Sequence, residues 1–438
     1  MMVLPSCQHN RHGHDRNTDS GVVSGESRKE GVESEMRSAV HPLDFKLYME
    51  RSGSMVSFDS EKSKGDFKAI VSTLLNRFPK VTSSDSTSVY IVNDNIYPYE
   101  GTVKAFLGQR DFFSSTKSIG DPSYTAFDRI FEMILADTRK YQVSALVTDL
   151  IYSVNGQETV SASKLLNEAY SLTHNVFKGK TNTSVIVLQM EADYNGLYYP
   201  YNSPNTGVEY SGDRPFYILL FASKDSMTEL YNAAEYKSFI NFSTLNGFEN
   251  MFCFTKMTYS PKYAVVLKYE HKGRFQSSRD DKKGGMPGII QARLSDNDEL
   301  TIPVAIDLSE IPLPNNYKKN KEYYEVNSDA GYTIENIQPI EDVENPAAIK
   351  EMMPSATHLM ILRTVEKPKK ETVSIKLAYK LPAWVKKTST DDDSRLSVDN
   401  FEDTTFGLKE VMEGMFNAYV PEGSNHYLFD IKLSVDKK

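Results

Sequence analysis

The chain has 438 residues, of which 39% are hydrophobic and 25% charged, which is enough for two or three folded domains of roughly 150 residues each. Its 50 Lys and Arg against 59 Asp and Glu give a formal charge of -9. This acidic balance argues against nucleic acid and anionic membranes as partners, because binding phosphate needs clustered basic side chains. The longest apolar run, residues 216–222, is far shorter than the roughly 18 residues that a transmembrane helix needs, and two distant cysteines exclude a disulfide framework.

Residues 1–40 are polar and rich in Ser, Gly and charge, so we expect a disordered N-terminal tail. Within it, the segment Leu4-Pro5-Ser6-Cys7 is similar to the end of a bacterial lipoprotein signal, in which the cysteine becomes lipidated. No basic and apolar segment precedes Cys7, so the sequence as written predicts a cytoplasmic chain. A start further upstream would instead predict a lipoprotein that is anchored to a membrane through Cys7.

Residues 41–258 alternate short apolar strands with amphipathic helices. We expect strands at 45–49, 89–92, 143–147, 184–190 and 216–222, an edge strand at 102–107, and helices at 67–78, 127–135, 165–172 and 227–234. Near-continuous apolar strands such as 143–147 are typical of strands that are buried on both faces. The alternation therefore predicts a doubly wound, mainly parallel α/β sheet with helices on both faces.

Side chains that carry oxygen follow the predicted strands, where open α/β sheets bind their ligands. They are Glu50, Ser52 and Ser54 after the first strand, Ser123 and Thr125 before the second helix, and Asp149 after strand 143–147. Carboxylates and hydroxyls without thiolates or imidazoles suit a hard cation, namely Mg²⁺, Mn²⁺ or Ca²⁺. Taken alone, Ser52-Gly53-Ser54 could equally be a tight turn that caps a helix.

The order and strand context of these residues resemble a von Willebrand factor A-type (VWA) domain over residues 43–258. That family has a metal-ion-dependent adhesion site made of an Asp-x-Ser-x-Ser motif, a separate Thr and a separate Asp. The resemblance implies that Ser52, Ser54 and Thr125 bind the cation through their hydroxyls, with Ser123 as a competitor for the third position, and that Asp149 binds it through water. Glu50 stands in the place of the first Asp, which holds metal-bound water in the family, and is a departure from the motif.

The resemblance implies a protein that binds a partner and is not an enzyme. Neutral hydroxyl ligands leave the cation electrophilic and with an open position, which an acidic side chain of a protein partner can fill. One alternative is a metal-free VWA-like scaffold in which Glu50 leaves the site empty. A metal-dependent phosphoester hydrolase is the weaker alternative, because the motif loops supply no His or Lys as a general base.

Residues 191–214 follow the strand that ends near Met190 and should emerge beside the same sheet edge as a tyrosine-rich loop. We expect Tyr198, Tyr199 and Tyr201 in this loop to bind ligand, because stiff amphipathic rings contribute contact area at little entropic cost. The alternative is that these rings pack against the second domain.

Residues 259–438 show a different pattern, with several strands, few helices and no converging titratable side chains. We expect strands at 264–267, 289–294, 300–306, 359–364, 372–379 and 427–435, and one helix with an apolar stripe between 406 and 419. The pattern predicts a mostly β, sandwich-like C-terminal domain, or two small modules divided within 310–355, with a role in packing or interaction.

Overall fold

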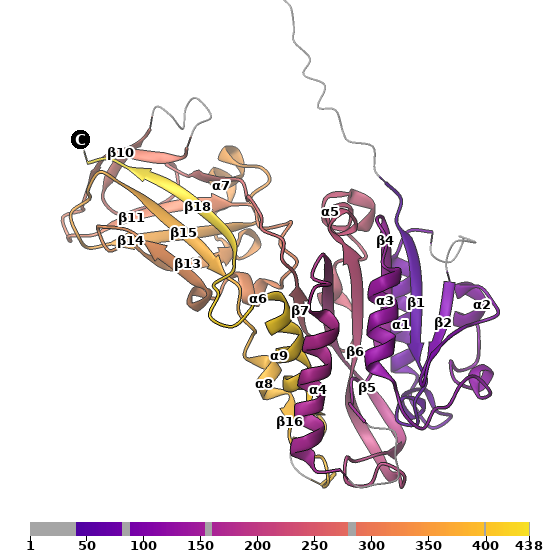
Figure 1. Ribbon diagram of the computed structural model, residues 1–438. Coiled ribbons are helices and arrows are strands. Elements are labelled where there is room, and N and C mark those ends of the chain that lie inside the picture. The colour runs from indigo at the N-terminus through magenta and orange to yellow at the C-terminus, as the bar shows by residue number, and fades with distance from the viewer. Residues whose placement is uncertain (1–40, 81–87, 154–159, 279–285, 398–399, 438) are drawn as a thin grey trace, which may run out of the picture. The chain divides into compact units, whose positions relative to one another are not determined.

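The computed structural model describes residues 41–80, 88–153, 160–278, 286–397 and 400–437 (Figure 1). The predicted tail, with its lipoprotein-like Cys7, lies outside the described residues. Within the described ranges, no helix is both long enough and apolar enough to cross a membrane, in agreement with the sequence.

A seven-stranded mixed sheet organises the first half of the chain, in the order β3-β2-β1-β4-β6-β5-β7. Its strands are β1 (Asp44–Glu50), β2 (Ser88–Val92), β3 (Ile96–Pro98), β4 (Gln142–Thr148), β5 (Thr183–Tyr198), β6 (Val208–Ser223) and β7 (Phe248–Phe254). β1 runs parallel to β2 and to β4, and the other neighbouring strands are antiparallel. The α/β class is therefore correct, whereas the expectation of a mainly parallel sheet is wrong.

The long hairpin of β5 and β6 explains the difference. Each strand has 16 residues, and they pair without interruption from Thr183 opposite Ser223 to Tyr198 opposite Val208. Antiparallel strands need only a short turn between them, whereas parallel neighbours need a crossover, usually a helix. Most of the predicted loop 191–214 is consequently strand, and the connecting turn covers only residues 199–207.

Helices cover both faces of this sheet, as the alternation predicts. They are α1 (Asp66–Arg77), α2 (Val103–Leu107), α3 (Phe127–Asp137), α4 (Ala162–Phe177) and α5 (Lys224–Asn232), with 3-10 turns at Met55–Asp59, Ser114–Thr116, Ala234–Tyr236 and Phe242–Thr244. The ring of Phe67 in α1 contacts Phe216, whereas that of Phe131 in α3 contacts Phe221. Because residues 216 and 221 of β6 point to opposite faces, α1 and α3 lie on opposite sides of the sheet.

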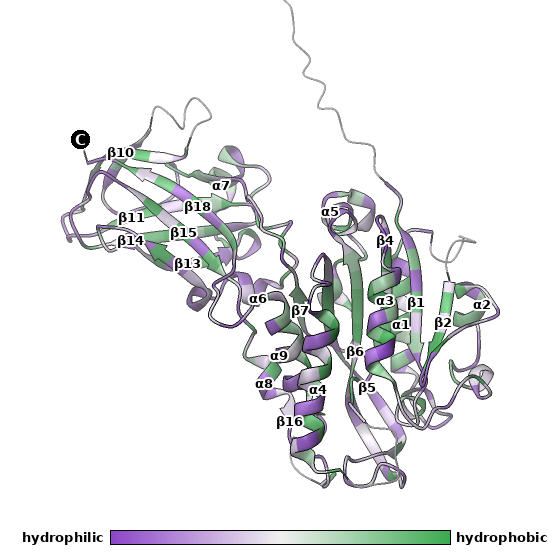
Figure 2. Cartoon of the chain, viewed as in Figure 1, coloured by the Kyte–Doolittle hydropathy of each residue, from purple (hydrophilic) through white to green (hydrophobic). Residues whose placement is uncertain are grey.

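The predicted edge strand at 102–107 is instead helix α2. The hydroxyl of Thr102 accepts a hydrogen bond from the backbone N–H of Ala105, which caps the first turn of the helix. In Figure 2, the upper part of β6 in the large sheet is mainly apolar and its lower part is more polar, whereas α3 and α4 carry both polar and apolar residues, as expected for helices with one face on the core.

Two further sheets, mostly antiparallel, follow β7. Their orders are β12-β15-β18-β10-β9 and β13-β14-β11-β8, and β10 with β18 is the parallel pair. The strands are β8 (Tyr263–Val265), β9 (Arg274–Ser277), β10 (Gly288–Arg293), β11 (Leu300–Ile306), β12 (Tyr324–Asn327), β13 (Thr333–Pro339), β14 (His358–Thr364), β15 (Glu371–Ala378) and β18 (Tyr427–Val435). Side chains of both sheets, such as Ile302 and Ile375, belong to one hydrophobic core. Each strand that the sequence predicts in this half is present.

The segment before β18 returns to the first sheet. It contains α8 (Trp384–Lys387), β16 (Ser389–Thr390), β17 (Thr405–Phe406) and α9 (Leu408–Tyr419), while α6 (Asn315–Lys318), α7 (Ala347–Met352) and 3-10 turns at Lys321–Tyr323 and Ile340–Asp342 lie earlier in the chain. Helix α9, which the sequence predicts, packs on α4. The hydroxyl of Tyr419 donates to the carbonyl oxygen of Thr183 at 2.6 Å and ties α9 to β5.

Candidate metal centre

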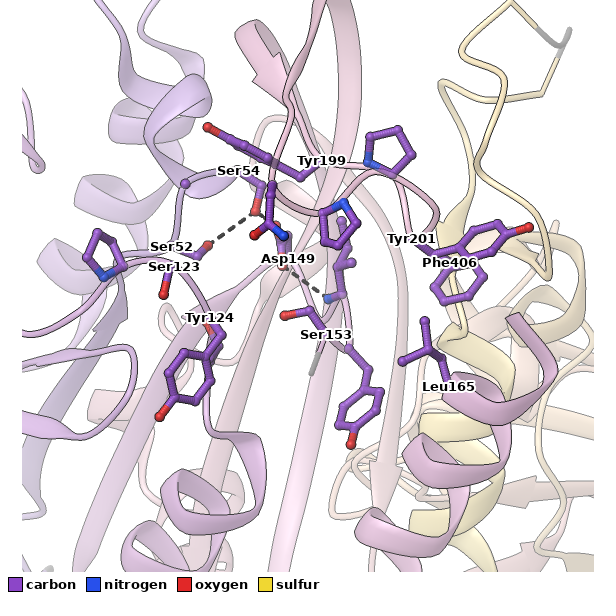
Figure 3. Close-up of a pocket in the computed structure, with 18 of the residues that line it drawn as sticks. Ser52, Ser54, Ser123, Tyr124, Asp149, Ser153, Leu165, Tyr199, Tyr201 and Phe406 are labelled. Atoms are coloured by element: carbon purple, nitrogen blue, oxygen red, sulfur yellow. Dashed lines mark hydrogen bonds between the residues drawn. The ribbon is translucent and has the colours of Figure 1, made fainter. Parts of the chain in front are cut away.

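The ends of β1 and β4 bring the predicted oxygen ligands to one pocket of about 530 Å³. β1 and β4 are parallel neighbours, with Met49 opposite Val147, so the residues that follow them emerge at the same sheet edge. All six predicted side chains line the pocket, namely Glu50, Ser52, Ser54, Ser123, Thr125 and Asp149. In Figure 3, Ser52 and Ser54 lie beside Asp149 although Asp149 is 95 positions from Ser54 in the chain.

Each carboxylate of the site accepts a short hydrogen bond from a hydroxyl. Ser54 Oγ donates to Asp149 Oδ2 at 2.5 Å, and Thr125 Oγ1 donates to Glu50 Oε1 at 2.5 Å. Ser52 Oγ lies 3.2 Å from Ser54 Oγ. Ser123, the competitor of Thr125, also lines the pocket but is exposed to solvent, whereas Thr125 is buried.

The backbone of both loops is held tightly. A Cβ atom on Gly53 would lie 2.9 Å from the ring of Tyr199, so only glycine lets that ring cover the turn between Ser52 and Ser54. After β4, Asp149 Oδ1 accepts a hydrogen bond from the N–H of Ile151 at 3.1 Å, and Leu150 adopts a left-handed conformation with φ of 55°. The two loops therefore present their oxygen atoms from fixed positions.

Burial makes the charge of the two carboxylates unfavourable. Glu50 is 1% exposed, and its Oε2 atom has no hydrogen-bond partner among the described residues. Burial and the negative charge of Asp149 raise the pKa of Glu50 to about 8, although hydrogen bonds from Thr125 and others act in the opposite direction. Burial also raises the pKa of Asp149. A cation placed among these groups would offset the repulsion.

The donor set fits a hard divalent cation, because carboxylate and hydroxyl oxygens are what Mg²⁺, Mn²⁺ and Ca²⁺ prefer. The unpaired oxygen of Glu50 is a buried acceptor that a cation or its bound water could satisfy. No group of three or more His, Cys, Asp and Glu side chains is arranged to hold a metal in the ranges that the structure covers. Metal binding at this pocket would therefore depend on the serine and threonine hydroxyls.

The three candidate tyrosines differ in their surroundings. Tyr199 and Tyr201 line the pocket, and Tyr201 stacks on Phe406 with ring centroids 5.1 Å apart and an interplanar angle of 9°. Tyr198 is buried, and its hydroxyl donates to Asp393 Oδ2 at 2.6 Å. Tyr199 and Tyr201 therefore line the pocket, whereas Tyr198 does not, and both Tyr198 and Tyr201 contact residues from the second half of the chain.

Arg214 is a buried cation that acts on Asp149, and no motif in the sequence marks it. Its guanidinium donates to the carbonyl oxygen of Phe401 and lies over the rings of Tyr198 and Phe401, 5.0 and 4.0 Å from their centroids. Its positive charge acts to lower the pKa values of Asp149 and Asp393, against the effect of burial. Asp393 and Phe406 were missed as well, because no motif marks either residue.

Comparisons with protein-family models, with curated proteins and with solved structures found no match to this chain.

Proposed function

We propose that the chain is a non-enzymatic protein that binds a protein partner in a manner dependent on a divalent cation. The proposal includes a VWA-like domain over residues 41–258 with a variant metal-ion-dependent adhesion site. The observation that carries it is the convergence of Ser52, Ser54 and Asp149, from the ends of two parallel strands, in one accessible pocket. Mg²⁺ is the expected cation, with Mn²⁺ or Ca²⁺ as substitutes.

The hydroxyls of Ser52, Ser54 and Thr125 would hold the cation, and Asp149 would reach it through water. A hydroxyl that donates its proton to a carboxylate keeps its lone pairs free for a cation, and Ser54 and Thr125 both donate in this way. Glu50 would stand behind these ligands and orient Thr125. The bound cation would supply an electrophilic position for the acidic side chain of a partner.

Two other functions are less well supported. A hydrolase would need a free general base or nucleophile near the cation. The described pocket lining contains neither His nor Lys, and its buried carboxylates, Glu50 and Asp149, already accept hydrogen bonds from Thr125 and Ser54. A metal-free scaffold has one observation in its favour, because the hydrogen bonds of Ser54 to Asp149 and of Thr125 to Glu50 satisfy both hydroxyl protons without a cation. Direct measurement of cation binding separates the scaffold from the proposed function.

The test is a titration of the full chain with Mn²⁺, followed by electron paramagnetic resonance of the free ion. We expect one Mn²⁺ site that Mg²⁺ displaces and that Ser54→Ala weakens by about 10-fold or more, as losses at metal sites commonly do. Ser123→Ala is the matched control at the exposed competitor position and should keep the affinity. If Ser54→Ala binds Mn²⁺ as well as the unchanged chain does, the cation is held elsewhere and the proposal fails.

A further inference from the structure

We propose that the pocket selects a peptide segment of the partner in which an acidic residue is next to a large apolar residue. This inference rests on the proposed function, because the acidic residue would be held by the cation. It adds a second specificity element, namely the apolar end of the same pocket, which consists of Leu165, Tyr201 and Phe406.

The size of the pocket is the first argument. A volume of about 530 Å³ lies within the range of roughly 300–1,000 Å³ that is typical of sites for drug-sized ligands. One cation and one carboxylate would occupy only the end near Ser52 and Ser54. Figure 3 shows Tyr201, Phe406 and Leu165 together at the other end, away from Ser52 and Ser123.

The apolar end is built to keep its shape. Leu165 and Phe406 are buried, and the stacked ring of Tyr201 lies against Phe406. The backbone N–H of Tyr201 donates to Asp393 Oδ1 at 3.0 Å, while Tyr198 donates to the other carboxylate oxygen. Asp393 is 1% exposed, and both of its carboxylate oxygens accept these hydrogen bonds, which fix the hairpin turn in place. An apolar ligand group would therefore bind a rigid surface, and the protein would lose little side-chain entropy on binding.

The charges around the pocket indicate that the ligand carries no negative charge beyond one carboxylate. Its lining contains no Lys, Arg or His among the described residues, so a second carboxylate or a phosphate would find no counter-ion beyond the cation. Ile151, Pro200 and Pro204 extend the apolar lining instead. A single carboxylate with an uncharged, apolar neighbour is therefore the chemistry that matches both ends.

The mouth of the pocket favours a peptide over a free small acid. Asp121, Ser123 and Asn205 line it and are exposed to solvent. Polar groups at the rim of a buried apolar patch are typical of protein interfaces, and these side chains can form hydrogen bonds with the backbone amides of an extended segment.

The experiment compares short peptides by NMR titration against the full chain in excess Mg²⁺. The peptides are acetyl-Gly-Gly-Glu-Phe-Gly-amide, the same peptide with Gly in place of Phe, and the same peptide with Gln in place of Glu. We expect the dissociation constant of the Glu-Phe peptide to be lower than that of the Glu-Gly peptide by a factor of about 10 or more. Burial of a Phe side chain contributes enough free energy for a factor of this size. Tyr201→Ala should remove the preference for Phe and leave the affinity for the Glu-Gly peptide unchanged.

Two control variants keep the result interpretable. Tyr201→Phe retains the ring that stacks on Phe406 and should retain the preference for Phe. Tyr210→Phe alters a tyrosine on the same hairpin that does not line the pocket, and it should change neither affinity.

The outcomes separate this inference from the function on which it rests. Equal affinities for the Glu-Phe and Glu-Gly peptides, both lost in EDTA, would overturn the apolar specificity and support cation-dependent capture. If the Gln-Phe peptide binds as tightly as Glu-Phe, or if EDTA has no effect, the proposed function itself fails. No binding of any peptide with Mg²⁺ would overturn both. Finally, 3-phenylpropionate binding as tightly as the Glu-Phe peptide would overturn the assignment to a peptide in favour of a free acid.

Discussion

Glu50 is the residue whose environment most distinguishes the site from an ordinary turn between a strand and a helix, because its carboxyl group is buried. Its carboxyl group is buried beside Asp149, and this environment raises its pKa from 4.5 to about 8. Between these two pH values the folded protein keeps a proton that the unfolded chain has released. The free energy of unfolding of the metal-free protein therefore falls as the pH rises from about 4.5 to about 8 because of this group.

The first prediction follows from that sign. Glu50→Gln removes the titrating group, so in EDTA it should raise the thermal midpoint at pH 8 and leave it nearly unchanged at pH 5. Excess Mg²⁺ should reduce the advantage at pH 8, because a bound cation compensates the carboxylate. Glu61→Gln, at a side chain that is 79% exposed, is the control and should have the same small effect at both pH values. If the difference in thermal midpoint between Glu50→Gln and the unchanged chain is the same at pH 5 and pH 8, this account of Glu50 is contradicted.

The second prediction concerns the contact that holds the pocket wall. Tyr198→Phe leaves the buried carboxylate of Asp393 without one of its hydrogen-bond donors, so it should destabilise the protein by about 1–3 kcal/mol in urea unfolding. The matched change Tyr210→Phe removes a hydroxyl that lies 3.3 Å from the carboxylate of Glu402 in an exposed contact. It should alter stability by no more than about 0.5 kcal/mol. If the two changes lower the free energy of unfolding equally, the buried contact between Tyr198 and Asp393 contributes no more to stability than the exposed one.

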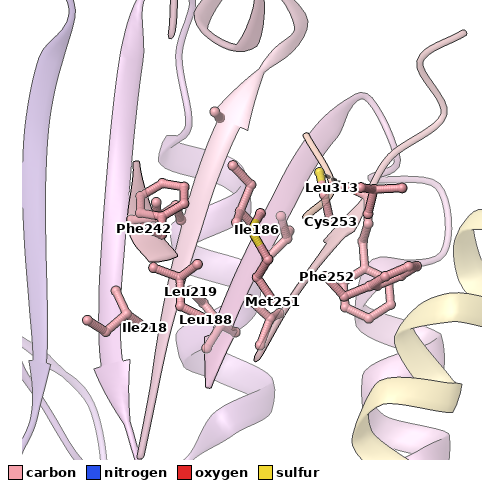
Figure 4. Packing of buried hydrophobic residues seen from close by; sticks show 14 of the residues in the cluster. Ile186, Leu188, Ile218, Leu219, Phe242, Met251, Phe252, Cys253 and Leu313 are labelled. Carbon is pink, nitrogen blue, oxygen red and sulfur yellow. Dashed lines mark hydrogen bonds between the residues drawn. The ribbon is translucent and has the colours of Figure 1, made fainter. Parts of the chain in front are cut away.

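Among the elements, the central strands could be predicted because their own sequences specify burial. Ile186 and Leu188 of β5 and Ile218 and Leu219 of β6 belong to the hydrophobic core of the sheet, and so does Met251 of the edge strand β7, which the sequence did not predict (Figure 4). Runs of apolar residues of this length are typical of strands that are covered on both faces, and helical spacing identified the helices that cover them.

The outer half of the β5–β6 hairpin could not be predicted, because its residues are stabilised by distant parts of the chain. Residues 191–198 and 208–215 include Asp, Asn, Gly and Glu, which are depleted in strands, and they read as a loop. Arg214 and Tyr198 instead contact Phe401, from the segment that returns between α8 and α9. Tertiary contacts of this kind override local propensity.

The candidate site likewise contains some residues that the sequence could predict and others that it could not. Ser52, Ser54 and Asp149 could be predicted together because each lies in the loop that follows a strand, and neighbouring parallel strands place these loops at one edge of the sheet. Phe406 lines the pocket and Asp393 anchors Tyr201 beside it, both from positions more than 200 residues away from β4, and no periodicity or motif connects either residue to the site.

The third prediction tests how closely α9 packs on α4. A Cβ atom on Gly414 would lie 2.1 Å from Thr173 Oγ1 and 2.4 Å from the carbonyl oxygen of Tyr170. Gly414→Ala should therefore destabilise the protein by about 1–3 kcal/mol through overpacking, although alanine favours an isolated helix by about 1 kcal/mol. Glu413→Ala, at the preceding position of α9, is the control and should be nearly neutral. An increase in stability with Gly414→Ala would show that the two helices are not in such close contact.

At the scale of the whole molecule, the pocket joins parts of the chain that are far apart in sequence. Its lining comes from the loops after β1 and β4, the loop before α3, the start of α4, the turn of the β5–β6 hairpin and β17. A cation bound there would contact only the folded arrangement, because the unfolded chain does not bring these oxygens together. Binding should consequently stabilise the folded protein as a whole.

Thermal unfolding of the full chain in EDTA, Mg²⁺, Mn²⁺ or Ca²⁺ tests cation binding most directly, with Ser52→Ala/Ser54→Ala as the variant. A cation at about 100 times its dissociation constant should add about 2.7 kcal/mol to the free energy of unfolding. We predict a rise in the midpoint with at least one of these cations that the double variant loses. An unchanged midpoint with every cation in millimolar excess, or an equal rise in the variant, would contradict the proposed metal centre and favour the metal-free scaffold.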